Sequence, residues 1–326
     1  MAVTRDDVAR AAGVSTAVVS YVLNDGPRPV SAEAKQRVLA AIKDLGYRRD
    51  GVARFLRVGR TQSLGVVLPD PALPYFAEFT KHLTAAAAAA GHQMLLASSA
   101  WDTAREHALL GNLAERRVEG IVLLSADPYQ DFGGLEVLGT PIVVVDRPEV
   151  AIRGTFAVIE HFVEHGHTDI GMIAGPSEFA AARRRSAAWT KAVEQAGLAV
   201  NPEWVLHMDV SRWGGYVAGD RLLGLDTRPS ALFVESDAQA HGFLRAAHER
   251  GVRVPQDCAL ITAEGTEQAR FSVPGLTTIA QPIEQIAAGA LDVVLHASEP
   301  GVHRMSDEHF ELVARGSCGC PDPVCS

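Results

Sequence analysis

Apolar and polar positions separate cleanly in residues 13 to 25, which read GVSTAVVSYVLND, when the segment is wound as a helix. At about 100° per residue, one arc holds Val18, Val19, Val22 and Leu23. The opposite arc holds Thr16, Ala17, Ser20, Tyr21 and Asn24. A strand would mix the two sets on both faces, so the pattern predicts a helix that buries its valines. We expect Ser15 to cap this helix and its outer arc to contact another molecule.

Two more helices are predicted around this one. The earlier helix follows Thr4, a residue type that caps helix N-termini, and ends at Gly13, which permits a left-handed turn. The later helix spans Ser31 to Leu45, and its inward-facing side chains are predicted to be Val38, Leu39 and Ile42. Two helices joined by a short glycine turn have the spacing of a helix-turn-helix, whose second helix enters the DNA major groove.

From residue 64 onward, short apolar runs alternate with helical patterns. The runs are LGVVL, QMLLA, GIVLLS, PIVVVD, IGMIAG, ALFVES and ALITAE. The helical segments between them include Ala77 to Ala90, Arg105 to Arg116, Ala180 to Ala196 and Ala238 to Arg250. Such alternation predicts parallel sheets with helices on both faces. We therefore expect an N-terminal all-α helix-turn-helix domain followed by an α/β body of two Rossmann-like lobes.

Length and composition narrow the class of protein. A chain of 326 residues is too long for one ordinary core, and 47% hydrophobic with 21% charged residues is typical of a soluble globular protein. We find no secretory signal and no uninterrupted apolar stretch long enough to span a membrane, so we expect a cytoplasmic protein. The four cysteines form no disulfide framework, because three of them lie within the last nine residues.

Charge is divided unevenly along the chain. Residues 1 to 60 carry eleven Lys and Arg against six Asp and Glu, a net charge of +5, whereas the remainder carries −14. A basic head on an acidic body fits a polyanion such as DNA as the partner of the head alone. Charge by itself is equally consistent with a solvated surface.

Three segments of the chain resemble a known family. They read VARAAGVSTAVVSYVLND, PVSAEAKQRVLAAIKDLGY and GVARFLRVGRTQSLGVVLPD. They are similar, in order and spacing, to the lac repressor and purine repressor (LacI/GalR-type) family of bacterial transcription regulators. The match runs from Thr4 to about Asp70, with weaker similarity to about residue 315. The resemblance implies a body like that of periplasmic binding proteins, a DNA-binding head and a small-molecule effector.

The resemblance also implies which residues contact DNA. In the head they are Thr4, Ser15, Thr16, Ala17, Ser20, Tyr21 and Asn24. Of these, Thr16, Ala17 and Tyr21 are expected to read base edges, and the others to contact phosphates or neighbouring edges. The set coincides with the outer arc and with the two cap residues.

The segment GVARFLRVGR resembles the family's hinge helix. A helix this short is unstable alone because nucleation is unfavourable, so pairing with the same segment of a second subunit over the minor groove would order it. Leu56 then corresponds to a wedge that kinks the duplex, with Arg54 nearby on the DNA. The alternative is an amphipathic linker whose Leu56 packs on the body.

The resemblance divides the chain into three parts, and the longest would bind the effector. The expected domains are 1–47 (helix-turn-helix), 48–61 (hinge) and 62–326 (effector binding and dimerisation), the last with an N-lobe of about 62–150 and 280–303 and a C-lobe of about 151–279 and 304–326.

Ligands in such folds lie beyond the carboxyl ends of the strands. The implied effector contacts are Tyr75, Phe76, Asp146, Arg185, Asp237 and Glu264. Together they predict a cleft for a sugar or similar hydroxylated metabolite, although each residue alone is also consistent with a helix cap or a surface charge.

One segment departs from the family pattern. Between DRP at 146–148 and EHFVEHGH at 160–167 the family usually has about ten more residues, including a strand that ends in an Asp-Asn pair. Only EVAIRGTFAVI remains here. We therefore expect an incomplete cleft or an unusual effector.

Other functions are less well supported. His161, Glu164 and His165 spell H-x-x-E-H, a zinc-peptidase pattern that would need a third ligand and an open coordination position. The tail SCGCPDPVCS is consistent with a metal site or a redox bridge, but a disordered end is the favoured interpretation. A solute-binding protein with the same body would need an export signal and no basic head. The phosphate-binding and dinucleotide-binding glycine motifs are absent, so we expect no cofactor, no metal and no enzyme.

The sequence as a whole predicts a cytoplasmic DNA-binding transcriptional regulator. We expect a homodimeric repressor that binds double-stranded operator DNA, with no membrane partner. A small effector between the lobes is expected to control its operator affinity.

Overall fold

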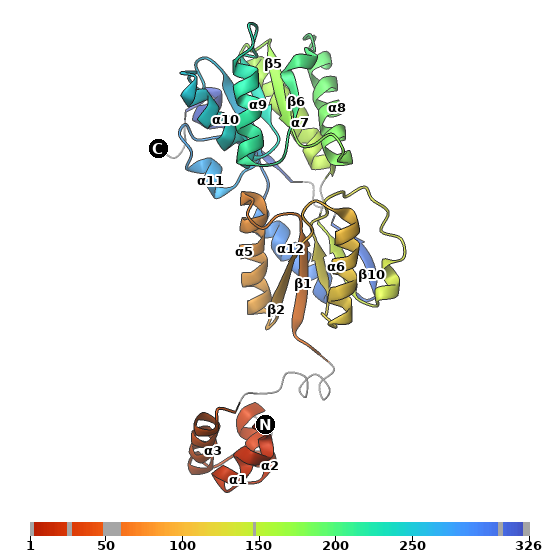
Figure 1. The fold of residues 1–326 in the computed structure, drawn as a ribbon, viewed down its shortest axis with the longest axis vertical. Helices are drawn as coiled ribbons and strands as arrows, with labels where there is room; N and C mark the ends of the chain where they lie inside the picture. Colours follow the sequence, from red (N-terminus) through yellow and green to blue (C-terminus); the bar gives the residue numbers. More distant parts are fainter. Residues whose placement is uncertain (1–2, 25–27, 48–59, 146–147, 306–308, 322–326) are drawn as a thin grey trace. The chain divides into compact units, whose positions relative to one another are not determined.

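The structure is a computed structural model that describes residues 3–24, 28–47, 60–145, 148–305 and 309–321. Chain contacts divide it into two units, Met1–Thr61 and Gln62–Ser326, which we call the head and the body (Figure 1). The predicted hinge contacts Arg54 and Leu56 lie outside the described residues, as does Asp146.

The head consists of three helices, α1 (Arg5–Ala12), α2 (Thr16–Asn24) and α3 (Ala32–Leu45). Thr4 and Asp7 form a reciprocal capping box at the start of α1. Gly13 ends α1 in the left-handed region at φ +62°, a conformation that glycine adopts without steric cost. This turn lets α2 start two residues later and fold back on the same core.

The structure of the head tests which side chains the sequence predicts to be buried. Val19 is fully buried with Val8 and Val38, and Val22 and Leu23 pack against the same cluster, as the helical pattern predicts. Val18, which the pattern places on the same side, is only half-buried and lies outside this cluster. The inward position predicted for Leu39 is wrong, because this side chain is 50% exposed. Among the described residues of the head, three short helices bury only a narrow stripe of α3.

The body contains two sheets, and the predicted fold class is confirmed. The first, which we call the N-lobe sheet, has the order β10-β4-β3-β1-β2 and is parallel throughout. Its strands are β1 (Ser63–Leu68), β2 (Gln93–Ser98), β3 (Ile121–Leu123), β4 (Pro141–Val144) and β10 (Gly301–Arg304). The helices of this lobe are α5 (Pro74–Ala89), α6 (Thr103–Glu115), α12 (Ile283–His296) and the 3-10 turn η1 (Leu135–Leu138).

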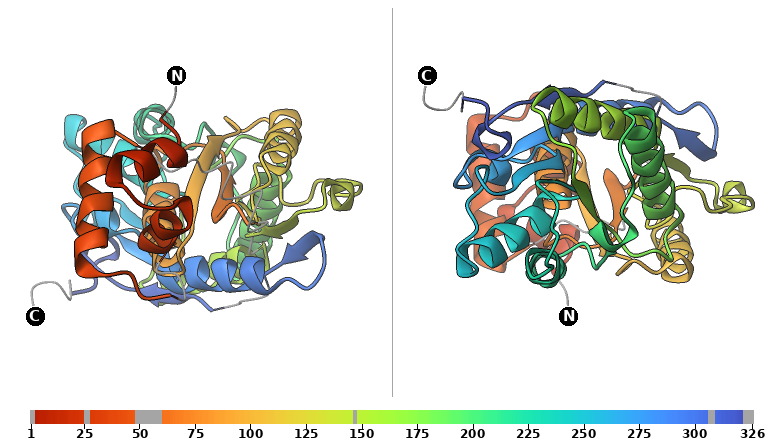
Figure 2. Two further views of the ribbon diagram at one scale, coloured as in Figure 1. Left: turned by 90° about the horizontal axis from the view of Figure 1, so that it is seen from below. Right: turned by 90° about the horizontal axis from the view of Figure 1, so that it is seen from above.

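The second sheet, the C-lobe sheet, has the order β11-β9-β8-β7-β5-β6. Its strands are β5 (Ile170–Ala174), β6 (Val205–His207), β7 (Ala231–Val234), β8 (Ala259–Glu264), β9 (Thr277–Ala280) and β11 (Glu311–Val313). All pairs are parallel except β11 with β9. The helices are α7 (Pro148–Glu164), α8 (Ala180–Gln195), α9 (Arg212–Leu223), α10 (Asp237–Glu249) and α11 (Glu267–Arg270), with 3-10 turns η2 (Pro202–Trp204) and η3 (Gly316–Cys318) (Figure 2).

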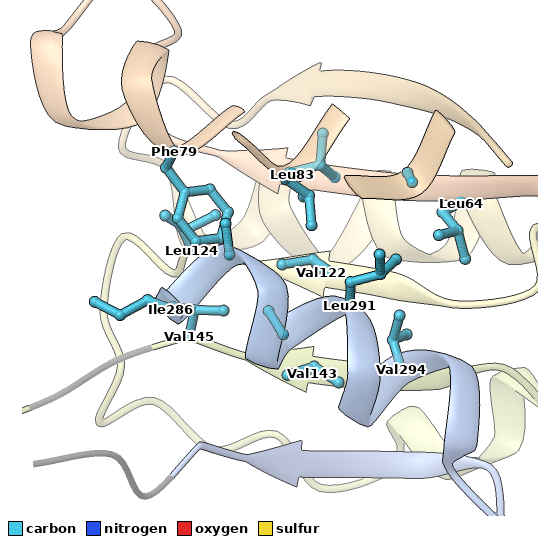
Figure 3. Close-up of a cluster of buried hydrophobic side chains, with 14 of the residues drawn as sticks. Leu64, Phe79, Leu83, Val122, Leu124, Val143, Val145, Ile286, Leu291 and Val294 are labelled. Carbon is cyan, nitrogen blue, oxygen red and sulfur yellow. The ribbon is translucent and has the colours of Figure 1, made fainter. Parts of the chain in front are cut away.

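Apolar cores lie on the faces of the sheets. In the N-lobe, α5 and α12 cover one face, where Leu64, Phe79 and Leu83 are fully buried against Val122 and Ile286 (Figure 3). Side chains from α6 and η1 cover the other face. The C-lobe has the same layered plan, because one cluster lies under α9 and α10 and another under α7 and α8. Burial on both faces explains why six of the seven predicted strands read as continuous apolar runs, whereas the edge strand β2 is largely exposed.

The departure after residue 148 has a structural counterpart. The described chain enters helix α7 at Pro148, and no strand lies between Pro148 and the end of that helix at Glu164. The short segment is therefore helical along its whole described length. None of the helices among the described residues is long and apolar enough to cross a membrane.

Close packing of α9 against α10 sets the position of the chain segment that begins α10. A Cβ added at Gly242 of α10 would lie 1.9 Å from the carbonyl oxygen of Arg212, and one added at Gly215 of α9 would lie 1.9 Å from that of Gln239. Neither backbone can accommodate a side chain without separation of the two helices.

We expect Gly242→Ala to lower the free energy of unfolding by about 1–3 kcal/mol, the usual cost of overpacking. Gly111→Ala is the matched control, because it lies in α6 with nothing within 4 Å of an added Cβ, and it should raise the free energy by about 0.5–1 kcal/mol. Urea unfolding measures both. Equal stability of the two variants would contradict the close approach.

Candidate functional site

The outer face of α2 is the first candidate site. Thr16 and Ala17 are exposed, and Ser20 and Tyr21 are half-buried. The first turn of α2 carries no acidic side chain that would repel a phosphate. The side chain of Asn24 lies outside the described set, although its backbone ends the helix. The face therefore presents small and hydroxylated side chains, which suits close approach to base edges.

The two predicted cap residues have local partners. The N–H of Val18 donates to Ser15 Oγ at 3.3 Å, so Ser15 caps α2. Thr4 Oγ1 donates to the Asp7 carboxylate at 2.6 Å, and these Thr4 hydrogen bonds hold the pKa of Asp7 below its ordinary value. Both residues thus stabilise helix N-termini, which are themselves favourable positions for phosphate.

The second candidate site is a cavity of about 200 Å³ in the body. It lies where strands of both sheets end, and it is lined by residues of both lobes. This is the position at which ligands bind in open α/β folds.

A row of aromatic rings lines the cavity. It runs from Tyr75 and Phe76 at the start of α5 through Trp101 to Phe179, which precedes α8. Neighbouring ring centroids are 5.6, 6.0 and 5.6 Å apart. Trp101 belongs to the N-lobe and Phe179 to the C-lobe, so the row connects the two lobes beside the ligand position.

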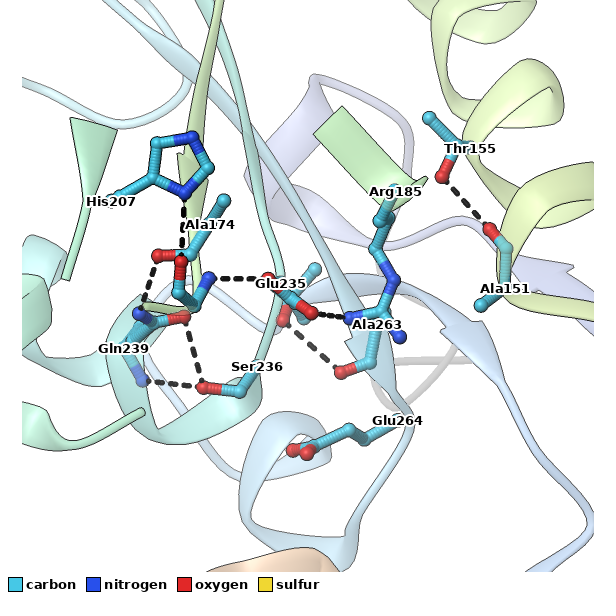
Figure 4. A network of polar contacts seen from close by, with 12 residues as sticks. Ala151, Thr155, Ala174, Arg185, His207, Glu235, Ser236, Gln239, Ala263 and Glu264 are labelled. Carbon is cyan, nitrogen blue, oxygen red and sulfur yellow. Dashed lines mark hydrogen bonds and ion pairs between the residues drawn. The ribbon is translucent and has the colours of Figure 1, made fainter. Parts of the chain in front are cut away.

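Polar groups of the C-lobe face this row. The guanidinium of Arg185, from α8, forms an ion pair with Glu235 directly after β7 (Figure 4). The other carboxylate oxygen of Glu235 accepts a hydrogen bond from the backbone N–H of Gly175. Glu235 is only 9% exposed, so Arg185 neutralises a buried charge as well as presenting N–H groups to the cavity.

Glu264, at the end of β8, is the second carboxylate on the cavity wall. It has a φ of +120°, which is rare for a residue other than glycine, and its Oε2 accepts from the N–H of Asp237 at 3.0 Å. Burial raises its pKa well above the ordinary value, and the nearby Asp237 carboxylate raises it further. The surroundings of Glu264 therefore disfavour its ionised form relative to an ordinary carboxyl group.

Asp237 has different surroundings from those that the sequence predicts. It is fully buried and does not line the cavity. Its carboxylate accepts from Thr262 Oγ1 at 3.0 Å, and from both the N–H and the hydroxyl of Thr266 at 2.8 and 2.7 Å. These bonds tie the start of α10 to β8 and the loop after it, which holds Glu264 in place.

Of the other predicted ligand contacts, Tyr75, Phe76 and Arg185 line the cavity, whereas Asp146 lies outside the described residues. Sequence reasoning missed Trp101, Phe179, Glu235 and Gln281, all of which line the cavity. Tyr75 donates to Gln281 at 3.4 Å. Trp101 and Phe179 come a few residues after predicted strands and Glu235 lies at the end of one, so the same carboxyl-end rule would have found these three if it had been applied to every residue there. Gln281 follows β9, a strand that the sequence did not predict.

The first turns of α7 form the wall next to the shortened segment. Val150, Ala151, Ile152, Gly154 and Thr155 all line the cavity. The Thr155 hydroxyl donates to the Ala151 carbonyl at 2.8 Å, so it is held within the helix. This wall is mainly apolar, where the family pattern would lead one to expect an Asp-Asn pair.

Two parts of the chain match known protein families. Residues 4–50 match the family of bacterial regulatory proteins named lacI, and residues 159–318 match the periplasmic binding protein-like domain. The chain is 37% identical to the HTH-type transcriptional repressor PurR of Pectobacterium atrosepticum over 305 residues, which is 90% of this chain and 89% of that protein. It is 34% identical to PurR of Pasteurella multocida over 330 residues, 96% of this chain and 98% of that one.

A solved structure extends the similarity to the fold of the whole chain. The crystal structure of the lac repressor dimer bound to operator and the anti-inducer ONPF has a TM-score of 0.79 and 26% identity, over 98% of this chain and 99% of that one. The curated relatives are transcriptional repressors and not enzymes. The chain therefore belongs to the LacI family of bacterial regulatory proteins, as a DNA-binding transcriptional repressor, similar to PurR, whose body is an effector-binding domain.

Proposed function

We propose that the chain acts in the cytoplasm as a homodimeric repressor that reads operator DNA with the outer face of α2. A small hydroxylated ligand held between the lobes adjusts its operator affinity. The observation that carries this proposal is the pairing of an outward polar face on α2 with a cavity in the body that Arg185, Glu235 and aromatic rings line.

In the head, Thr16 and Ala17 are placed to meet base edges because they are exposed at the start of α2. Tyr21 follows on the same side, and Ser20 and Asn24 flank it. The capped N-termini at Thr4 and Ser15 favour phosphates through their N–H groups. We assign residues 48–61 to the hinge, with Arg54 on the DNA backbone and Leu56 between base steps.

Dimerisation is supported by an apolar edge of the N-lobe sheet. Strand β2 is at the end of the sheet order, and Leu95 and Leu96 within it are 39% and 46% exposed. Exposed apolar edge strands are pairing surfaces. The lac repressor structure with the same fold is a dimer on its operator, so we place the partner subunit against β2.

In the body, the cavity suits a compact ligand with hydroxyl groups. Arg185 supplies N–H donors, Glu235 supplies acceptors, and Glu264 adds a second carboxyl group. Aromatic rings cover an apolar ring face, as is common for sugar-sized ligands. The volume of about 200 Å³ is below the usual range for drug-sized ligands, so we propose a sugar or similar hydroxylated metabolite of small size.

The lobes also contact one another outside the aromatic row. The Arg184 guanidinium lies 3.8 Å from the ring centroid of Tyr129, and the N–H of Glu267 donates to Glu78 Oε2 at 3.0 Å. A ligand that binds one lobe angle more tightly than another shifts the population toward it. We propose that this shift orders or releases the hinge segment and so changes operator affinity.

Tyr21→Ala tests the reading face. An operator is first selected from random DNA with the parent protein, and binding to it and to single-base variants is then measured by fluorescence anisotropy at fixed salt. Loss of a base contact should reduce discrimination at one position by about 1–3 kcal/mol. Gln36→Ala, on the exposed side of α3, is the control and should discriminate like the parent. Unchanged base preference in Tyr21→Ala would refute the assignment.

Leu96→Glu tests the dimer surface. A charge on the β2 edge should shift the chain from dimer to monomer in sedimentation velocity, because burying it in an interface is costly. Val273→Glu is the matched control, since this apolar side chain is 93% exposed in the C-lobe. A dimer of undiminished stability in Leu96→Glu would place the interface elsewhere.

Arg185→Ala tests the effector site. Sugars and nucleobases are screened for those that raise the melting temperature of the parent, and each active compound is retested on the variant. We expect the shift to disappear in Arg185→Ala and to persist in Lys191→Ala, an exposed position on the same helix. The unliganded Arg185→Ala variant should itself melt earlier, because Glu235 keeps a buried charge without its counter-ion. An equal ligand-induced shift in all three proteins would exclude this cavity.

A further inference from the structure

The last described turn of the chain packs against the C-terminal half of α7. The turn η3 ends at Cys318, and Cys320 follows two residues later. On α7, His161 and His165 are one helical turn apart, so both imidazoles lie on the same side, with ring centroids 4.2 Å apart. Two segments that are 150 residues apart in sequence thus bring two imidazoles and two thiols together.

The donor atoms of these four side chains are close to one another. His161 Nε2 lies 3.3 Å from Cys318 Sγ and 3.9 Å from Cys320 Sγ. His165 Nε2 lies 3.3 Å from Cys320 Sγ. The donor atoms of His161, Cys318 and Cys320 all lie within 4.8 Å of one another. A tetrahedral zinc ion with Zn–S of about 2.3 Å and Zn–N of about 2.0–2.1 Å places neighbouring nitrogen and sulfur atoms about 3.6 Å apart, which is close to these values.

A backbone contact orients one of the imidazoles toward the sulfur atoms. His165 Nδ1 lies 2.9 Å from the carbonyl oxygen of His161. Because a carbonyl oxygen only accepts, Nδ1 carries the proton and Nε2 keeps its lone pair facing Cys320. A second nitrogen bonded to a carbonyl is the usual support of a metal-ligating histidine.

Burial differs across the cluster in a way that suits metal exchange with solvent. His161 and Cys318 are buried, Cys320 is half-buried and His165 is exposed. One side of the cluster is therefore fixed in the core of the C-lobe, and the other side is open to incoming ions. Among the described residues, His161, Cys318 and Cys320 are the group of His, Cys and acidic side chains with the geometry for a metal ion, and His165 lies next to Cys320.

We propose that His161, His165, Cys318 and Cys320 bind one Zn²⁺ ion. The two thiols release their protons on binding, and two thiolates with two neutral imidazoles give a complex without net charge. Cys₂His₂ is a common ligand set of structural zinc.

This assignment gives the H-x-x-E-H pattern a different use from that in zinc peptidases. Both of its histidines would be ligands, but two thiolates would take the remaining tetrahedral positions. A catalytic zinc site needs an open position for water, and this site has none. The site is therefore structural, and Glu164 is not a catalytic base.

The metal would fasten the C-terminal segment to α7. The segment is already attached to the C-lobe sheet, because the N–H of Thr277 donates to Ser317 Oγ at 2.8 Å and Ser317 Oγ donates to the Leu260 carbonyl at 2.6 Å. The other end of α7, from Val150 to Thr155, lines the ligand cavity. Zinc would thus brace the helix that replaces the family's usual strand at the lobe junction.

The test uses the full-length protein, produced with zinc in the medium and dialysed, with metal measured by plasma mass spectrometry. We expect about one zinc per chain in the parent and loss of at least nine-tenths of it in Cys318→Ser/Cys320→Ser and in His161→Gln/His165→Gln. Cys258→Ala and His167→Gln are matched controls that remove a cysteine and a histidine outside the cluster, and they should keep the parent's zinc content. Cobalt substitution should give the visible absorption of a tetrahedral ion with thiolate charge transfer.

A thiol measurement on the unmutated protein keeps the test independent of variant folding. Adding a chelator should increase by two the cysteines that react with a thiol reagent in the native state, and should lower the melting temperature until zinc is restored. A parent with far less than one zinc per chain would overturn the proposal. Zinc that survives both double substitutions, or a Cys318–Cys320 disulfide in freshly purified protein, would overturn it as well.

Discussion

Burial of Val19 between Val8 and Val38 is the constraint on which DNA recognition depends. These three side chains are fully buried and come one from each helix of the head. Since a helix repeats every 3.6 residues, burying Val19 turns Ala17 and Tyr21 toward the opposite side. The reading face needs no stabilising contact of its own, because the core sets the rotation of α2. Because only a few apolar side chains set this rotation, we expect the head to tolerate their loss poorly.

In the body, buried carboxylates with hydrogen-bond partners fix the chain in the way that buried valines fix it in the head. Glu235 is held by Arg185 and by the N–H of Gly175, and Asp237 is held by Thr262 and Thr266. These bonds fix the chain where β7 passes into α10, at the cavity wall. A half-satisfied buried carboxylate is costly, so the network specifies one arrangement of the C-lobe side of the site. The aromatic row supplies another part of the wall and includes rings from both lobes.

Long periodic patterns could be predicted from the sequence, whereas short elements and tertiary partners could not. Six of the seven apolar runs became strands with both faces buried, and the seventh became the exposed edge strand β2. Strands β6, β9, β10 and β11 were missed because each has only three or four residues, several of them polar. Leu39 was assigned inward because periodicity cannot tell how wide a stripe three helices cover. Asp237 was predicted to line the cavity because of its position after a strand. It lies directly beyond the turn that Glu235 and Ser236 occupy.

The C-terminal segment shows the same limit most clearly. Its composition favoured a disordered end, and that interpretation is wrong for the described part, since Ser317 and Cys318 are buried and Cys320 packs on α7. The pairing of H-x-x-E-H with C-x-C becomes visible only when β11 returns the chain to the C-lobe sheet. Both motifs can be found in the sequence, but only the folded chain shows that they lie side by side.

The central claim is that the outer face of α2 lies against the bases of the operator. Site-specific photocross-linking measures this directly, with a photoreactive amino acid placed at Ala17 or at Ala40, two exposed positions on α2 and α3. The account predicts efficient cross-linking to operator bases from position 17 and little from position 40. Cross-linking from position 40 but not from position 17 would contradict it.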